Sequence, residues 1–191
     1  SFTLALVLAG CGQPAGPDAQ ALLRAYEGAL ARTADTAVAF APDGEQEQRV
    51  LTRLADYFAP MTASSARDRT SLVYAPNAWL FDNLAVVEGQ QNIQAYFVKA
   101  TTEADQLSVD FLQVARADAD YFIRWRMSID APALADEPIV SYGITQFRFD
   151  ADGRVLMHRD FWDAATGLHE YLPGVGGWMQ RLRTTLGAMP E

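Results

Sequence analysis

The chain has 191 residues, of which 50% are hydrophobic, and its formal net charge at pH 7 is −9. This length and apolar content predict one globular domain that can bury a sizeable core. The acidic excess, with no run rich in Lys or Arg, argues against nucleic acid as a partner, because a polyanion would be repelled.

Residues 1–17 have the pattern of a secretion signal. An apolar run at residues 2–9 is too short to span a bilayer and ends in Leu-Ala-Gly-Cys, before a tract rich in Gly, Pro and Ala. Leu-Ala-Gly-Cys resembles the lipobox of bacterial lipoproteins, in which the chain is cut before the Cys and the Cys is lipidated. The resemblance implies a signal-peptide remnant at residues 1–10, a lipoprotein linker at residues 11–17 and lipidation of Cys11.

The same resemblance implies a location. We expect the protein on the periplasmic side of a bacterial membrane, held there by its lipid anchor. Gly12 resembles the pattern that sorts lipoproteins to the outer membrane rather than the inner one. The alternative is a frayed apolar segment whose single cysteine is incidental.

Three helices are predicted in the first half of the chain, each from apolar side chains at helical spacing. The first covers residues 18–32, the second begins at residue 45, and the third follows Gly89. Residues 71–82 are strand-like, with an interruption at residues 75–77. The apolar stripes contain Leu22, Tyr26 and Leu30 in the first helix, Val50, Leu54, Tyr57 and Phe58 in the second, and Ile93, Tyr96 and Phe97 in the third.

From residue 107 onward the apolar period changes to two, which predicts β-strands. Helices followed by consecutive antiparallel strands predict an α+β fold, and residues 18–191 are expected to form this one domain. Beyond residue 164 the pattern is helical again. The four strands are expected at residues 107–115, 121–129, 139–149 and 154–162.

The last predicted strand carries ionisable side chains among its apolar ones. Strand alternation places His158, Asp160 and Trp162 on one face, so whichever face points inward buries at least one ionisable group. A His and an Asp two residues apart on one face form a plausible acid/base pair, because the carboxylate can orient the imidazole. The alternative is a solvated cluster of charges.

The turn before this strand decides which face points inward. If residues 150–153 are all turn, Thr145 lies opposite His158, and Thr145, Phe147, His158, Asp160 and Trp162 share one wall. The same register places Gly143 opposite Asp160. A bulge at Gly153 would instead turn His158 and Asp160 to the other face.

The order of these elements resembles the nuclear transport factor 2-like superfamily, over about residues 46–165. The local match is closest at residues 74–82 with 88–97, and at residues 143–155 with 158–162, which are similar to the closing hairpin of SnoaL-like domains. The resemblance implies a cone made of a strongly curved antiparallel sheet wrapped by the N-terminal helices, here with an added C-terminal helix. That scaffold hosts isomerases, cyclases, dehydratases, epoxide hydrolases and binding proteins, so it does not fix a reaction.

The resemblance also implies site residues. The general base of ketosteroid isomerase corresponds to Asp82 and its oxyanion-binding Tyr falls near Tyr57, whereas its second oxyanion donor, an Asp, is replaced by Thr145. A hydroxyl donates a weaker hydrogen bond than a neutral carboxyl group, which argues against steroid-type isomerisation. In SnoaL-like cyclases the acid/base corresponds to Asp160, with His158 as its partner here. For Tyr57 the alternative is core packing.

Other chemistry is poorly supported. His158 and His169 have no Cys partner and no metal-ligand spacing, so no metal site is expected, and no cofactor would be required. The Arg-x-Asp element of limonene epoxide hydrolase is absent, because the stretch at residues 124–126 is Arg-Trp-Arg. The tryptophans Trp125 and Trp162 are expected in the core or the pocket wall.

The sequence therefore predicts a lipid-anchored domain that binds a small, largely apolar molecule, with possible acid/base chemistry by Asp82 or Asp160. The alternative is a non-catalytic ligand carrier, or an interaction module that docks a partner or a second copy of the chain as a homodimer. Such a module would use the sheet face or the apolar stripe of the tail at residues 175–186. We expect that stripe to pack against its own domain.

Overall fold

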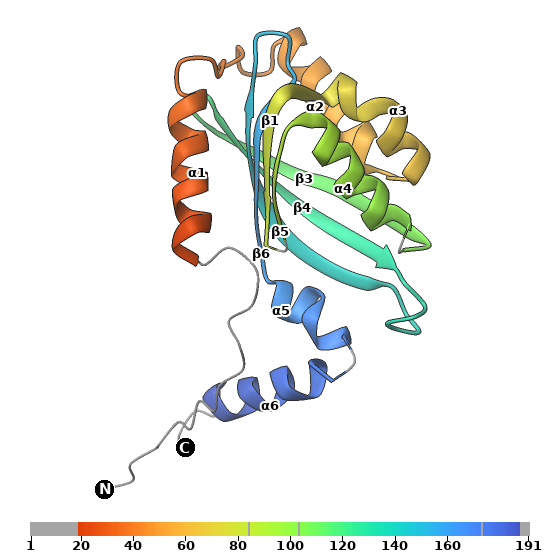
Figure 1. Cartoon of the computed structure of the whole chain (residues 1–191). Helices are drawn as coiled ribbons and strands as arrows, with labels where there is room; N and C mark the ends of the chain where they lie inside the picture. Colours follow the sequence, from red (N-terminus) through yellow and green to blue (C-terminus); the bar gives the residue numbers. More distant parts are fainter. Residues whose placement is uncertain (1–18, 84, 103, 173, 188–191) are drawn as a thin grey trace, which may run out of the picture.

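The computed structural model describes residues 19–83, 85–102, 104–172 and 174–187, so Cys11 and the predicted signal segment lie outside the described residues. The structure is α+β, as predicted (Figure 1). Its helices are α1 (Ala19–Thr33), α2 (Glu45–Phe58), α3 (Ala63–Val73), α4 (Gln90–Thr102), α5 (Ala164–Gly167), the 3-10 helix η1 (His169–Tyr171) and α6 (Gly176–Gly187). Its strands are β1 (Tyr74–Asp82), β2 (Ala85–Glu88), β3 (Gln106–Ala117), β4 (Asp120–Asp130), β5 (Ile139–Phe149) and β6 (Val155–Trp162).

The six strands form one curved, open sheet in the order β2-β1-β6-β5-β4-β3 (Figure 1). Neighbouring strands are antiparallel except β1 and β6, which run parallel. The predicted curved antiparallel sheet is confirmed, and β1 and β6 form a parallel pair within it. A parallel pair needs a long connection, and here most of the sheet and α4 lie between its two strands in the sequence.

The helices cover both faces of the sheet (Figure 1). Helices α2, α3 and α4 pack on the inner face, where Leu54, Leu80 and Phe147 belong to the main core. Helix α1 lies on the outer face, where its Ala29 contacts a smaller core that contains Phe81 and Met157. Alternation along β1 and β6 explains the two cores, because consecutive residues of a strand point to opposite faces.

Helix α3 was not predicted as a helix, and its last residues were assigned to the following strand. Its sequence has few apolar residues, and only Ala66, Thr70 and Val73 are buried. The helix begins with a capping box, in which the hydroxyl of Thr62 accepts a hydrogen bond from the backbone N–H of Ser65. Its position therefore depends on the cap and on tertiary contacts more than on an apolar stripe.

The register between β5 and β6 differs from the expected one by two residues. Thr145 pairs with Asp160 and Phe147 with His158, whereas we expected Thr145 opposite His158. One residue of the shift arises at the turn, because Phe149 pairs with Val155, and a bulge beyond Val155 adds the second. A shift of one residue would turn His158 and Asp160 to the other face of the sheet. Two such shifts return them to the face that carries Thr145.

Gly153 is the turn position with the least freedom to change. Its φ is +75°, and a Cβ added there would meet Val50 Cγ2 at 2.3 Å. We expect Gly153→Ala to lower the free energy of unfolding by about 2 kcal/mol, because strain in the left-handed region adds to a collision with the core. Urea unfolding of the two proteins would measure the difference.

Gly174→Ala is the matched control for this substitution. Gly174 has a similar φ of +78°, but no atom lies within 4 Å of an added Cβ. It should therefore cost only the backbone strain, about 1 kcal/mol. Equal losses in the two variants would show that contact with Val50 does not contribute.

The C-terminal helix does not pack as we expected. Val175, just before α6, and Trp178 and Leu182 within it are 40%, 61% and 38% exposed, so these members of the apolar stripe are not buried against the domain. Helix α6 contacts η1 and lies below the sheet in Figure 1. None of the helices in the described ranges is long and apolar enough to cross a membrane.

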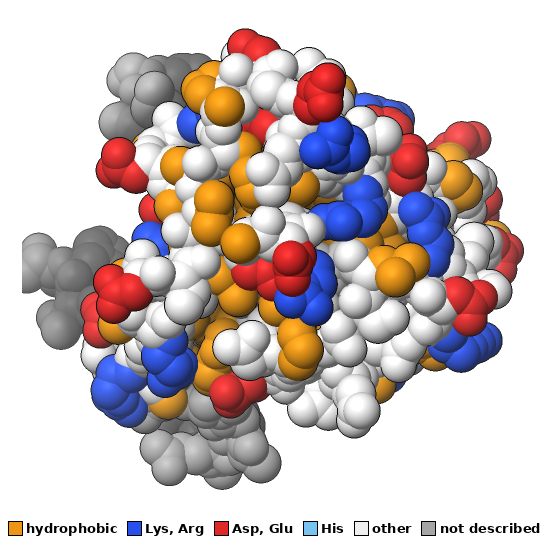
Figure 2. All heavy atoms as spheres, turned by 90° about the horizontal axis from the view of Figure 1, so that it is seen from above, with side chains coloured by type: hydrophobic (Ala, Val, Ile, Leu, Met, Phe, Trp, Pro, Cys, Tyr) orange, Lys and Arg blue, Asp and Glu red, His pale blue; other side chains and the backbone are white. Residues whose placement is uncertain are grey.

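The surface seen from above carries acidic and basic side chains intermixed with apolar ones (Figure 2). Ion pairs also reach into the protein. Glu47, whose side chain is only 2% exposed, receives two hydrogen bonds from the guanidinium of Arg116, and Arg148 binds Asp120 in the same bidentate manner. Each of these carboxylates has a cationic partner, as buried charges need.

Candidate functional site

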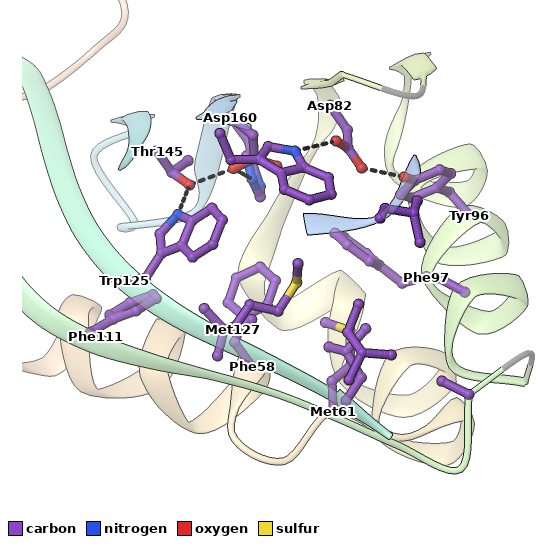
Figure 3. A pocket seen from close by; sticks show the side chains of 18 of the residues that line it. Phe58, Met61, Asp82, Tyr96, Phe97, Phe111, Trp125, Met127, Thr145 and Asp160 are labelled. Atoms are coloured by element: carbon purple, nitrogen blue, oxygen red, sulfur yellow. Dashed lines mark hydrogen bonds and ion pairs between the residues drawn. The ribbon is translucent and has the colours of Figure 1, made fainter. Parts of the chain in front are cut away.

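A cavity of about 240 Å³ lies between the inner face of the sheet and helices α2 and α4 (Figure 3). Most of its lining is apolar, and the polar side chains gather on one side. In Figure 3, Thr145, Asp160, Asp82 and Tyr96 lie along that side, while Phe58, Met61, Met127 and Phe111 lie opposite. The cavity is therefore suited to a molecule with an apolar body and one polar end.

Asp160 is held by two hydrogen bonds to the same oxygen. The hydroxyl of Thr145, its partner across β5 and β6, donates to Asp160 Oδ1, and His158 Nε2 lies 2.9 Å from that atom. The indole N–H of Trp125 donates to Thr145 Oγ1 over 2.8 Å, so the one proton of Thr145 is committed to Asp160. Among the described residues no donor reaches Oδ2, and the side chain of Asp160 is 16% exposed.

His158 connects Asp160 to the core. Its Nδ1 lies 2.7 Å from the hydroxyl of Tyr74, which is fully buried. Burial, with smaller contributions from Tyr57 and Asp160, raises the pKa of Tyr74 well above its ordinary value, so Tyr74 keeps its proton. His158 Nε2 faces the carboxylate and donates to Asp160, while Nδ1 shares the second hydrogen bond of the ring with Tyr74.

Asp82 is the second carboxylate of the cavity, at the end of β1. Trp162 Nε1 donates to its Oδ1 over 3.1 Å, and Tyr96 of α4 donates to its Oδ2 over 2.5 Å. Burial and the neighbouring Asp82 raise the pKa of Tyr96, so this hydroxyl also stays protonated. Both donors are neutral groups.

The parallel pairing of β1 and β6 brings the two carboxylates together. Leu80 pairs with His158 and Phe81 with Arg159, and one further step of this register places Asp82 beside Asp160. Neighbouring strands lie about 4.8 Å apart, and alternation points both side chains to the inner face. Two acidic side chains therefore enter the cavity from adjacent strands.

Gly143 makes room for the indole that holds this arrangement. A Cβ added at Gly143 would lie 2.3 Å from Trp125 Cζ2, so the ring of Trp125 lies directly over the backbone of β5. The pairing of Trp125 with Gly143 in β4 and β5 produces this contact. A small residue opposite a large one thus lets the indole reach Thr145.

Seven of the eight predicted site residues within the described ranges line the cavity. They are Asp82, Trp125, Thr145, Phe147, His158, Asp160 and Trp162. Tyr57 does not, because it is fully buried among the helices and its hydroxyl donates to Thr70 Oγ1 over 2.6 Å. Burial raises the pKa of Tyr57 to about 12, and its placement in the core corrects the oxyanion-binding role that the resemblance implied.

Tyr74 and Tyr96 are the polar residues that the sequence analysis did not assign to the site. Tyr96 was expected on the inner stripe of its helix, where a hydroxyl among apolar side chains is a signal of a polar contact. Tyr74 opens β1 and reaches His158, which is 84 positions later in the sequence. No three His, Cys, Asp or Glu side chains among the described residues gather closely enough to hold a metal ion.

No protein-family model and no curated protein matches the chain. Solved structures do. A Catenulispora acidiphila protein with a ketosteroid isomerase-like fold matches with a TM-score of 0.54 and 14% identity, over 62% of this chain and 88% of that one. A candidate SnoaL-like polyketide cyclase from Shewanella putrefaciens matches with a TM-score of 0.53 and 15% identity, over 64% and 93%.

An LEH-like epoxide hydrolase from M. tuberculosis is also similar, with a TM-score of 0.51 and 10% identity, over 74% of this chain and 95% of that one. At such identities the likeness concerns the fold and not the reaction. The curved sheet, the helices on its inner face and these neighbours confirm the predicted architecture. The chain has the nuclear transport factor 2-like fold.

Proposed function

We propose that the cavity binds a small, largely apolar molecule and that Asp160 transfers a proton to or from it, without a cofactor. The observation that carries this proposal is a carboxylate in the wall of an apolar cavity, with one oxygen fixed by Thr145 and His158 and the other without a donor among the described residues. A positioned base next to a bound ligand is the arrangement that proton transfer requires. Isomerases, cyclases and dehydratases use such steps.

The hydrogen bonds assign different roles to the polar residues. Trp125 donates to Thr145, and Thr145 donates to Asp160. Trp162 and Tyr96 both donate to Asp82. These four donors of the cavity are therefore already engaged. The oxyanion-donor role predicted for Thr145 is replaced by positioning of Asp160, and none of these four groups has a free proton to donate to an oxyanion on the ligand.

Two further observations support ligand binding over the interaction module. The aromatic side chains of the cone do not fill it, since a cavity remains. The similar protein from Catenulispora acidiphila is described in complex with trimethylamine, a small molecule. The lipid anchor at Cys11, the periplasmic location and pairing with a second copy stay predictions from the sequence.

Filling the cavity tests the proposal. Nitrobenzisoxazole is a suitable neutral, apolar probe, because a carboxylate that removes its ring C–H proton drives N–O cleavage and gives a coloured cyanonitrophenolate. We expect the wild-type protein to open it with saturation kinetics, and Ala100→Trp, on the cavity side of α4, to abolish saturation. The released proton passes from Asp160 to water.

Ala95→Trp is the matched control, since Ala95 lies on the exposed side of the same helix. This variant should retain the wild-type rate and saturation. A rate that is the same in both tryptophan variants would place the reaction outside the cavity and contradict the proposal.

A further inference from the structure

We infer that the ligand of this cavity carries a positive charge, as a small ammonium compound with an apolar body, and that Asp82 pairs with that charge. The inference rests on the proposed function, because it names the chemical class of the molecule that the cavity binds. It follows from the charges, the aromatic rings and the hydrogen-bond donors that line the site.

No positively charged side chain of the described cavity lining pairs with Asp82. Asp82 and Asp160 enter it from adjacent strands, and none of the described residues that line it is a Lys or an Arg. His158 contacts Asp160, so it does not serve as a partner of Asp82, whose hydrogen bonds come from Tyr96 and Trp162. A cation bound beside Asp82 would supply the charged partner that the cavity lining does not.

The rest of the protein treats its enclosed carboxylates differently. Glu47 is paired with Arg116, and Asp120 is paired with Arg148, each through two hydrogen bonds. Asp82 instead accepts from the neutral hydroxyl of Tyr96 and the neutral indole of Trp162. These donors fix the direction of the carboxylate but leave its charge available to a ligand.

The rings around the two carboxylates suit an ammonium group. Trp125, Trp162, Tyr96 and Phe97 all line the cavity, and an organic cation is attracted to the faces of such rings. The opposite side, around Met61 and Met127, is apolar and can hold the hydrocarbon body (Figure 3). A cation at Asp82 would place the neighbouring atoms of the ligand next to Asp160, the proposed base.

The hydrogen bonds made by the donors of the cavity also argue against an anionic ligand. A ligand carboxylate or phosphate needs N–H or O–H donors, and those of Trp125, Thr145, Trp162 and Tyr96 are already directed to acceptors of the protein. An anion would also meet two carboxylates. A cation with no hydrogen-bond requirement, such as a quaternary ammonium group, meets neither obstacle.

Two probes of the same shape separate charge from hydrophobicity. Phenyltrimethylammonium and tert-butylbenzene differ in one atom and one charge, and binding of each to the full chain can be followed through the fluorescence of Trp125 and Trp162 in the cavity wall. We expect the cation to bind at least about tenfold more tightly than the hydrocarbon. Asp82→Asn should weaken the cation about tenfold and change the hydrocarbon by less than about twofold.

Asp110→Asn is the control for the loss of one negative charge, because Asp110 is exposed on β3 and pairs with Arg126 outside the cavity. It should leave both affinities unchanged, and circular dichroism would verify that each variant is folded. Equal affinity of wild type for the two probes would overturn the inference while leaving an apolar binding cavity in place. Failure of both probes to bind would overturn the inference and the proposed function together.

Discussion

Asp160→Asn should lower the turnover of nitrobenzisoxazole by about 100-fold while its KM stays within about twofold of wild type. The amide oxygen of Asn can accept from Thr145 and His158 as Oδ1 does now, so the shape of the cavity is kept. The amide nitrogen would take the place of Oδ2, the oxygen with no donor among the described residues, and it cannot accept a proton. Steady-state rates over a range of probe concentrations separate the two parameters.

Thr145→Val tests whether the fixed orientation of Asp160 contributes to that rate. The substitution keeps the carboxylate but removes the hydroxyl that donates to Oδ1 and accepts from Trp125. We expect turnover to fall about tenfold, because a base that is free to rotate spends less time in the productive geometry. If Asp82→Asn abolished turnover and Asp160→Asn did not, the roles assigned to the two carboxylates would be exchanged.

The members of the cavity wall were predictable, whereas their partners were not. Alternation along β6 requires His158, Asp160 and Trp162 to share a face, whatever the register. The partner of each depends on how many residues the turn uses and on the bulge beyond Val155, and the composition of residues 150–153 does not determine either. The wall was therefore correct although the pairing was off by two residues.

The parallel contact between β1 and β6 is the feature that the sequence could not supply. Continued by one residue, its register places Asp82 beside Asp160, and the resemblance had offered these two residues as alternative bases from different relatives. It also brings Tyr74 to His158. Contacts between residues this far apart in the chain depend on the whole topology, so local patterns do not predict them.

Glu47→Gln is also expected to have a large effect on stability, because it removes the ion pair that joins Glu47 of α2 to Arg116 of β3. Glu47 is almost fully enclosed between α2 and β3, and it also accepts from the backbone N–H of Asp43. The hydrogen bonds from Arg116 hold the pKa of Glu47 below its ordinary value, against the opposing effect of burial. We expect the variant to lose about 2 kcal/mol of unfolding free energy at neutral pH, because the guanidinium loses its charged partner.

The pH dependence of this loss has a definite sign. A carboxylate whose pKa is lower in the folded than in the unfolded state contributes stability above its unfolded pKa, near 4.5, and that contribution disappears as the pH falls through the folded pKa. The difference between wild type and Glu47→Gln should therefore shrink below pH 4.5, as measured by urea unfolding across an acid series. Glu45→Gln on the same helix is the control, since Glu45 pairs with Arg49 at a side-chain exposure of 91% and such pairs contribute less than about 1 kcal/mol. A difference between Glu47→Gln and wild type that persists unchanged in acid would mean that shape, and not the ion pair with Arg116, is what Glu47 supplies.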